Sequence, residues 1–188
     1  MASRTSAHRL PRHASPGTHT TAPHPKHAPE NHALPDAIIV RPVRPADFAA
    51  WSPLWDGYNA FYGRSGPTAL APEITHMTWA RFFDAYEPVH ALVAQSGSEG
   101  ALLGLVHYIF HRSTTSIAPT CYLQDLFTVE AARGRGVGRA LIHAVYERAR
   151  EAGAARVYWQ THETNQTAMK LYDGVAERSG FVVYRKVF

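Results

Sequence analysis

The chain has 188 residues, a formal net charge of +4 and a single cysteine, Cys121. One cysteine excludes a disulfide framework within the chain and fits a reducing compartment, so we expect a cytoplasmic protein. No apolar run approaches the roughly 20 residues that a membrane-spanning helix requires, so we expect no membrane association.

The first 36 residues differ in composition from the rest of the chain. They are dominated by Pro, His, Ala, Ser and Thr, and their only large aliphatic residues after Met1 are Leu10 and Leu34. Such a segment cannot bury enough apolar area to offset the entropy lost on ordering. We expect a disordered tail over 1–36 and one domain over 37–188. Histidines in the tail are spaced irregularly among prolines, which favours a solvated tail over a metal site.

The positive charge gives little support for a nucleic-acid partner. The tail holds four basic and two acidic residues, which leaves +2, and the other +2 belongs to residues 37–188. The domain is therefore nearly neutral, whereas nucleic-acid-binding domains carry a clustered basic surface. A nucleic-acid binder acting through the tail is the least supported function.

The domain alternates between strand-like and helix-like segments. Hairpin-like strands in its middle and crossover helices near its end predict an α/β fold with a mixed sheet and helices on both faces. Asp47 is in position to cap the first helix. In chain order the predicted elements are strand 38–43, helix 48–62, helix 72–86, strand 89–94, strand 101–111, strand 122–129, helix 136–152, strand 156–161, helix 165–178 and strand 181–187.

The segment 133–139, with the sequence RGRGVGR, lies between a predicted strand and a predicted helix. Alternating glycines let the backbone approach a ligand and turn its N–H groups toward it. The following helix directs the positive end of its dipole to the same place. These properties predict a pyrophosphate-binding turn, although the three arginines alone would also suit a solvated basic face.

Two common phosphate-binding motifs do not fit this turn. A dinucleotide fingerprint requires GxGxxG, but Arg139 stands where the third glycine should be. A P-loop requires GxxxxGK followed by Ser or Thr, and no window of the chain supplies it. Both motifs also follow the first strand of their unit, whereas this turn comes late in the domain.

The pattern R/Q-x-x-G-x-G/A, found here within RGRGVG, resembles the signature of the GCN5-related N-acetyltransferase (GNAT) family. The strand YLQDLFTV (122–129) is similar to the central strand of that family, and 163–181 resembles its last helix, with the spacing of Asn165 and Tyr172. The element order over 37–188 also resembles that fold. The closest similarity is to the polyamine/histone-type branch.

The resemblance implies a mostly antiparallel sheet with a splayed central strand, and acetyl-coenzyme A (acetyl-CoA) as co-substrate without a metal. It implies that the central strand holds the pantetheine through Leu126, Phe127 and Thr128, with the Leu126 N–H polarising the thioester carbonyl. Asn165 would contact the cofactor near the pantetheine. The pyrophosphate would lie on Arg133, Gly134, Arg135, Gly136, Val137, Gly138 and Arg139.

For the chemistry, the resemblance implies direct attack by a primary amine, with Tyr172 as the acid that protonates the departing thiolate. Tyr172 also suits an apolar helix face, so a core tyrosine is the alternative. Asp125 is either a base acting through water or an ion-paired strand residue. Polyamine-type enzymes have glutamate where this chain has Gln124, and an amide cannot serve as a carboxylate base.

The acceptor has no diagnostic motif. Gln124 and Asp56 are candidates for contacting it, and His107 and His111 either line its site or are structural. The acceptor would be a small amine or polyamine, an amino-acid derivative or a protein lysine. The alternative function is a catalytically impaired CoA-binding module that acts as a regulator or partner protein. The resemblance is also compatible with a homodimer, and the sequence leaves the oligomeric state open.

Overall fold

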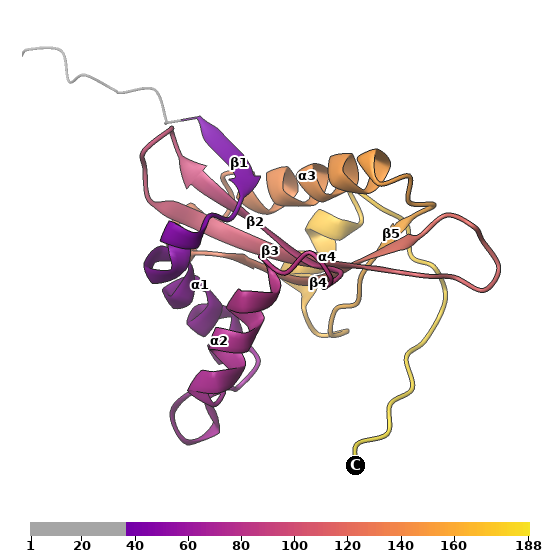
Figure 1. Cartoon of the computed structure of the whole chain (residues 1–188), viewed down its shortest axis with the longest axis horizontal. Coiled ribbons are helices and arrows are strands. Elements are labelled where there is room, and N and C mark those ends of the chain that lie inside the picture. Colours follow the sequence, from indigo (N-terminus) through magenta and orange to yellow (C-terminus); the bar gives the residue numbers. More distant parts are fainter. Residues whose placement is uncertain (1–36) are drawn as a thin grey trace, which may run out of the picture. The chain divides into compact units, whose positions relative to one another are not determined.

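The computed structural model of the protein describes residues 37–188, so the predicted tail and its histidines lie outside the described residues. A five-stranded sheet in the order β1-β2-β3-β4-β5 forms its centre (Figure 1). The strands are β1 (Ile38–Pro42), β2 (Val89–Ser96), β3 (Leu102–His111), β4 (Thr120–Thr128) and β5 (Val157–Tyr158).

The sheet is antiparallel except at one edge. Strands β1 to β4 pair with their neighbours in antiparallel register, and β5 runs parallel to β4. This last pairing covers only Cys121 opposite Val157 and Tyr122 opposite Tyr158. Strand β4 continues to Thr128, so most of its edge on the β5 side has no strand beside it. The predicted splay of the central strand is therefore present.

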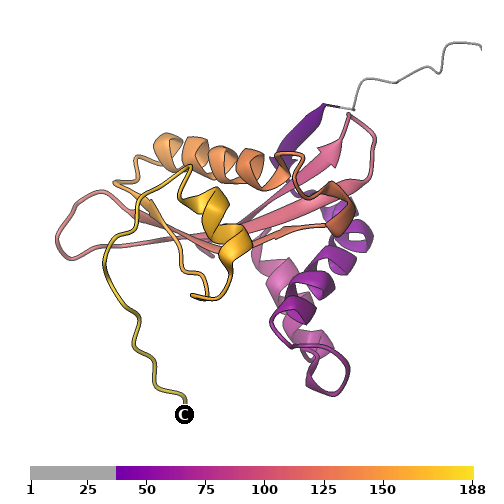
Figure 2. The same ribbon diagram turned by 180° about the vertical axis from the view of Figure 1, so that it is seen from behind.

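Helices cover both faces of the sheet, as predicted (Figures 1 and 2). Helices α1 (Phe48–Phe61) and α2 (Pro72–Arg81) enclose one core with Val93 and Leu105 of the sheet. Helices α3 (Val137–Glu151) and α4 (Gln166–Tyr172) lie on the other face. Each core forms because the alternating side chains of the strands meet the apolar stripe of a helix.

The stripes have the spacing that an α-helix requires. The buried residues of α3 are Val137, Leu141, Ile142, Val145 and Ala149, which recur every three to four positions. This packing fixes the first turn of α3 against the sheet. The glycine-rich turn before it is therefore attached to a rigid support.

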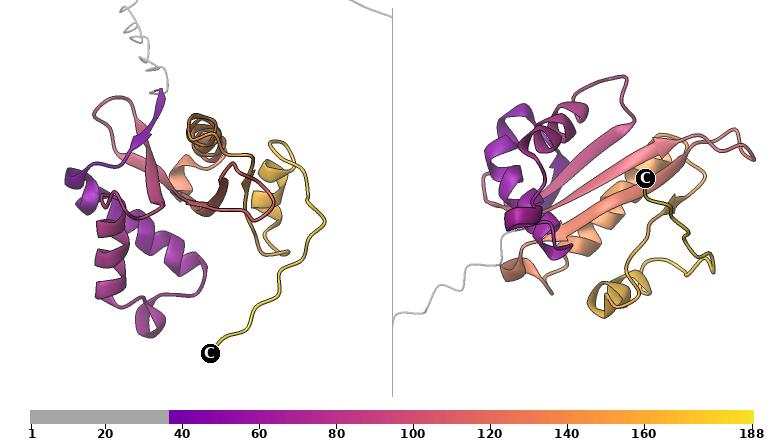
Figure 3. Two further views of the ribbon diagram at one scale, coloured as in Figure 1. Left: turned by 45° about the vertical axis from the view of Figure 1, so that its right-hand side comes forward. Right: turned by 90° about the horizontal axis from the view of Figure 1, so that it is seen from below.

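The predicted final strand, 181–187, is wrong. The described chain forms no strand after β5, and Figure 3 shows the C-terminal segment as an extended trace. The aromatic side chains of Phe181, Tyr184 and Phe188 are almost fully exposed. An alternating apolar pattern forms a strand only beside a partner that supplies a hydrogen-bonding edge. A two-residue β5 does not supply one.

Two helices end earlier than predicted. Helix α2 ends at Arg81 rather than at 86, because the carboxylate of Asp84 accepts a hydrogen bond from the Tyr86 N–H at 2.9 Å and starts a turn. Helix α4 ends at Tyr172 rather than at 178, where Asp173 and Gly174, poor helix formers, follow.

The predicted capping role of Asp47 is also corrected. Asp47 stands at the N-cap of α1, but its carboxylate makes no bond to that helix. It accepts a hydrogen bond from the Arg44 N–H at 2.7 Å and pairs with Arg41 at 2.6 Å. These bonds lower the pKa of Asp47, with the Arg41 hydrogen bond as the largest cause. The pair ties the end of β1 to the start of α1. Among residues 37–188, no helix is long and apolar enough to cross a membrane.

Candidate active site

The glycine-rich turn forms the N-terminal end of α3. Gly134 and Gly136 have φ angles of +74° and +87°, which side-chain-bearing residues rarely adopt, and Gly136 is the N-cap of the helix. A Cβ atom at either glycine would meet no atom within 4 Å, so open space lies in front of this backbone. The first N–H groups of a helix have no partner within it. The turn therefore presents free donors to open space, as a pyrophosphate requires.

The other predicted members of this cradle lie at the same helix end. Arg133, Arg135 and Arg139 are exposed, and Val137 is buried beneath the turn. Arg139 also donates to the Gly174 carbonyl at 3.4 Å. Gly138 allows a close approach, because a Cβ there would lie 3.1 Å from the Leu171 side chain. The turn thus holds cationic side chains around the free donors and packs against α4.

A bulge in β4 decides which backbone groups face its open edge. Asp125 lies opposite His107 while Leu123 lies opposite Tyr108, so Gln124 has no counterpart on β3. Beyond the bulge, the Val129 N–H donates to the Leu103 carbonyl at 3.0 Å.

Counting back from Val129 by alternation, Phe127 and Asp125 direct their backbone groups toward β3. Leu126 and Thr128 direct theirs to the opposite edge, which no strand covers. The two predicted backbone contacts with the pantetheine, at Leu126 and Thr128, thus belong to the open edge. The backbone groups of Phe127 do not face the open edge. The Phe127 ring lies close to Gly57 of α1, where an added Cβ would be 2.7 Å from the ring.

The same bulge corrects a prediction about side chains. Strict alternation would put Tyr122, Gln124, Leu126 and Thr128 on one side of the sheet. In the structure Leu126 packs with the α3 core, as Leu123 before the bulge also does. One extra residue reverses the alternation, so Asp125 turns toward the α1 face, where it meets His107.

Asp125, His107 and Trp51 form a buried polar chain. Nδ1 of His107 lies 2.9 Å from the Asp125 carboxylate, and the Trp51 indole N–H donates to Nε2 of His107 at 3.1 Å. An indole nitrogen can only donate, so Nε2 carries no proton and Nδ1 must donate to the carboxylate. His107 is therefore neutral and its tautomer is fixed. Asp125, 8% exposed, is held in one orientation by this bond.

Three tyrosines surround the Asp125 carboxylate. Burial raises the pKa of Tyr58, and the charge of Asp125 and a hydrogen bond to it raise the pKa further. The pKa of Tyr62 is raised by burial and then by the charge of Asp125. The pKa of Tyr122 is raised by burial, then by Tyr158 and Asp125. The carboxylate thus faces a group of neutral phenols.

The two predicted residues of the last helix lie at its opposite ends. The Asn165 side chain caps α4, accepting from the Ala168 N–H at 3.4 Å and donating to Thr161 at 3.2 Å. Tyr172 is the last residue of α4, and its ring packs in a T-shaped contact with Trp159, with the ring centroids 5.4 Å apart. Burial, followed by the charge of Tyr62, raises the pKa of Tyr172 to about 12. Its phenol is therefore protonated at neutral pH and can serve as a proton donor.

The candidate acceptor contacts Gln124 and Asp56 lie apart from each other. Gln124 is exposed at the bulge of β4. Asp56 is exposed on α1 and lines a hollow of about 480 Å³ between that helix and the loop to α2, together with Asn59 and Arg64. His111 is exposed at the end of β3, where it hydrogen-bonds to the Tyr158 hydroxyl, whereas His107 is buried.

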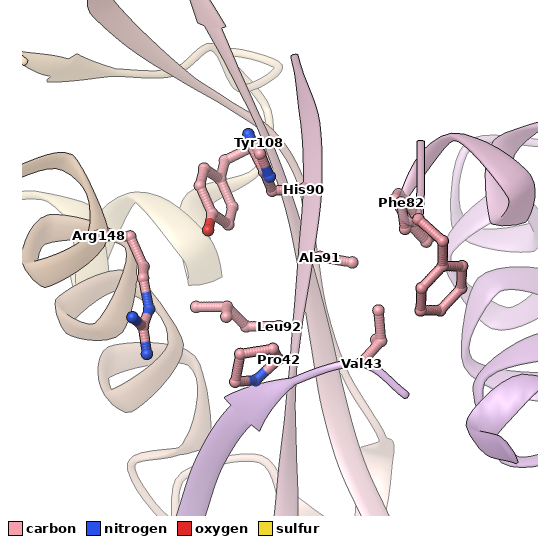
Figure 4. Close-up of a pocket in the computed structure, with 9 residues that line it drawn as sticks. Pro42, Val43, Phe82, His90, Ala91, Leu92, Tyr108 and Arg148 are labelled. Atoms are coloured by element: carbon pink, nitrogen blue, oxygen red, sulfur yellow. The ribbon is translucent and has the colours of Figure 1, made fainter. Parts of the chain in front are cut away.

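A second hollow lies far from the glycine-rich turn. It is lined by Pro42, Leu92, Tyr108 and Arg148 among others (Figure 4). Arg148 stands twelve residues after Gly136, so the two are separated by about 18 Å along α3. This hollow is therefore not part of the candidate site.

The described residues offer neither a cluster of metal-ligating side chains nor a reactive cysteine. Over residues 37–188, no cluster of three or more His, Cys, Asp or Glu side chains could hold a metal ion. Cys121 is fully buried, and burial raises the pKa of its thiol to about 12, so it is not a nucleophile at neutral pH.

Sequence reasoning missed the bulge and the fixed His107–Asp125 pair. Nothing in the local sequence marks Gln124 as a bulge, since it is neither a glycine nor next to one. The even spacing of His107 and His111 on one strand left a role in the acceptor site and a structural role both open, and only the register pairs His107 with Asp125.

Comparison with known proteins agrees with this geometry. The family model described as "Acetyltransferase (GNAT) family" matches residues 51–175. The D-amino-acid N-acetyltransferase HPA3 of Saccharomyces cerevisiae is 36% identical over 151 residues, which cover 80% of this chain and 91% of that protein. The uncharacterized N-acetyltransferase YhfO of Bacillus subtilis is 31% identical over 147 residues, covering 77% and 94%.

A solved structure of AAC(6')-Iy, in complex with a bisubstrate analog containing CoA, shares the fold with a TM-score of 0.67. It is 15% identical and covers 81% of this chain and 99% of that one. The polyamine/histone-type branch stays a prediction. On the match to residues 51–175 and the two relatives, the chain belongs to the GNAT family of N-acetyltransferases, enzymes that take their acetyl group from acetyl-CoA.

Proposed function

We propose that the protein transfers an acetyl group from acetyl-CoA to the amine of an amino acid by direct attack. The observation that carries the proposal is the 36% identity to a D-amino-acid N-acetyltransferase over 91% of that relative. Most of the domain takes part in this similarity, so it includes the segments around both substrates. A small amine, a polyamine or a protein lysine could undergo the same reaction, but this relative favours an amino acid over them.

The cofactor would be held by two backbone surfaces. Its pyrophosphate would lie on the N–H groups of the turn at Gly134–Gly138, with Arg133, Arg135 and Arg139 around it. Its pantetheine would run along the open edge of β4, beside Leu126 and Thr128. Asn165 already caps α4, so it would contact the cofactor only through its remaining amide hydrogen. The bound thioester supplies the acetyl group.

The chain would assist at two atoms of the reaction. The Leu126 N–H would donate to the acetyl oxygen, where negative charge develops. The phenol of Tyr172 would give its proton to the departing sulfur. The raised pKa of Tyr172, about 12, supports this role because the proton is present at every pH at which the protein would operate.

Asp125 would remove the proton that the attacking amine must lose, acting through a water molecule. The support is its orientation by the neutral His107 at 2.9 Å and its 8% exposure, which leaves it a small opening toward solvent. Gln124 cannot act as a base, so this carboxylate on the same strand is the available alternative. Gln124 and Asp56, both exposed, would contact the acceptor rather than the reacting atoms.

The alternative of an inactive CoA-binding module is not favoured. An open glycine turn, a protonated tyrosine and an oriented carboxylate would together supply the groups that the transfer needs.

Acetyl-CoA turnover tests the function directly. We expect purified protein to release free thiol with amino acids of one or both configurations, and faster than with diamines, polyamines or a lysine peptide. A thiol-reactive dye measures the release, and a reaction without acceptor is the control. Absence of release across the whole panel would contradict the proposal and favour the binding module.

Binding at the glycine turn can be tested with a control at the other end of the same helix. Gly136→Ala and Gly153→Ala both place a methyl group at a positive φ, +87° and +65°, and into open space. Both should lose about 1–2 kcal/mol of stability. Only Gly136→Ala should weaken acetyl-CoA binding, by at least about tenfold, as measured by calorimetry. Equal affinities in the two variants would place the cofactor elsewhere.

The proton donor can be tested by removing one hydroxyl. Tyr172→Phe should lower kcat by about 10²–10⁴-fold while the Kd for acetyl-CoA changes little. Tyr146→Phe is the control, since its hydroxyl bonds to the Val175 carbonyl at 3.0 Å, close to α4, and has no role in the reaction. If kcat of Tyr172→Phe equals that of the control, Tyr172 is only a core residue.

The base can be tested by an isosteric change. Asp125→Asn keeps an oxygen that accepts the hydrogen bond from Nδ1 of His107, so the fold should persist. We expect kcat/KM to fall by about 10²-fold or more and to regain part of the loss at high pH, where the free amine is abundant. Retained kcat/KM with a lowered Tm would instead show that Asp125 serves only the structure.

A further inference from the structure

Four aromatic residues of α1 form one continuous row. Trp51, Trp55, Tyr58 and Tyr62 are spaced by four, three and four positions, which places them on one face of the helix. The ring centroids of successive members lie 5.8, 5.3 and 5.0 Å apart. At its start the row meets His107, whose ring lies 5.1 Å from that of Trp55 and which holds Asp125. The start of the row therefore lies beside the His107–Asp125 pair, whose carboxylate also acts on Tyr58 and Tyr62.

The other end of the row meets a positive charge. The guanidinium carbon of Arg64 lies 5.8 Å from the Tyr58 ring and 5.5 Å from the Tyr62 ring. Such distances permit cation–π attraction. Tyr58 and Tyr62 thus interact with both Arg64 and the Asp125 carboxylate, whose charge acts on both phenols.

Arg64 is held in place by a buried amide. Its Nε donates to the Asn59 side-chain oxygen at 2.7 Å, and Asn59, 3% exposed, donates to the Trp55 carbonyl at 2.9 Å. The Arg64 backbone N–H also bonds to the Asn59 carbonyl at 2.9 Å. Among residues 37–188 no carboxylate forms an ion pair with Arg64, and its two terminal nitrogens make no hydrogen bond. The guanidinium is therefore fixed while its outer edge remains available.

An α-amino acid carries a carboxylate and an ammonium group separated by one carbon atom. A planar guanidinium binds a carboxylate with two parallel hydrogen bonds, whereas a lysine acts only as a point charge. We propose that Arg64 binds the carboxylate of the acceptor and thereby selects amino acids over simple amines. This inference rests on the proposed function, and it assigns to Arg64 the specificity for the acceptor. Tyr58 and Tyr62 would contact the rest of the acceptor.

Substrate pairs that differ only in the carboxylate test the inference. We would measure kcat and KM for each accepted amino acid, its carboxamide and its decarboxylated amine, for example alanine, alaninamide and ethylamine. Wild type should prefer the amino acid. Arg64→Gln should raise the KM for the amino acid by about 10- to 100-fold. It should change the KM for the carboxamide less than about twofold. Arg64→Lys should show an intermediate loss.

Controls separate recognition from structure. Arg112→Gln, which removes an exposed arginine from the β3–β4 loop, should leave all three substrates unchanged. The Kd of Arg64→Gln for acetyl-CoA and its circular dichroism should match those of wild type. Equal losses with the amino acid and its carboxamide would show that Arg64 only supports α1, and would overturn the inference. If wild type turned over amines with no preference for those that carry a carboxylate, only the inference about Arg64 would be overturned. If no amine were turned over, the proposed function would be overturned as well.

Discussion

The one-residue bulge at Gln124 determines which backbone groups and side chains β4 presents at its open edge and on its α1 face. Before the bulge, β4 pairs with β5, and the Cys121 N–H donates to the Arg156 carbonyl at 3.0 Å. After it, the alternation of the backbone is reversed, and Leu126 and Thr128 face the uncovered edge. The same reversal turns the Asp125 side chain to the α1 face. In the proposed function, this single inserted residue gives one edge of β4 to the pantetheine and one face to the acceptor.

The free edge of β4 has a thermodynamic cost that the fold sustains through packing elsewhere. Exposed strand edges invite pairing with other chains, and proteins usually cover them. Here the sheet is stabilised on both faces, by α3 over the side of β3 that carries Val106 and by α1 and α2 over the side that carries Leu105. The edge can therefore stay unpaired in a structure that remains rigid around it, and in the proposed function the cofactor takes the position of the missing strand.

The acceptor side depends on buried hydrogen bonds of fixed direction. A Trp51 donor fixes the tautomer of His107, and His107 in turn fixes Asp125. An Asn59 amide fixes Arg64 in a similar way. Because these bonds are made before any ligand arrives, little conformational entropy would be lost when an acceptor binds. The aromatic row lies beside both groups, since it contacts His107 at Trp55 and Arg64 at Tyr58 and Tyr62.

The sequence by itself determined the local features. Glycines at 134 and 136 predicted a backbone turn, which the structure forms with positive φ at both, and the apolar spacing after them predicted α3, because both features depend on neighbouring residues. The family, the layered fold and most elements followed from these patterns. Tertiary structure alone decided the register of β3 on β4, hence the bulge, the pairing of His107 with Asp125 and the place of Arg64 beside Tyr58 and Tyr62. It also left 181–187 without a strand, because a strand requires a partner edge and the neighbouring sequence cannot supply one.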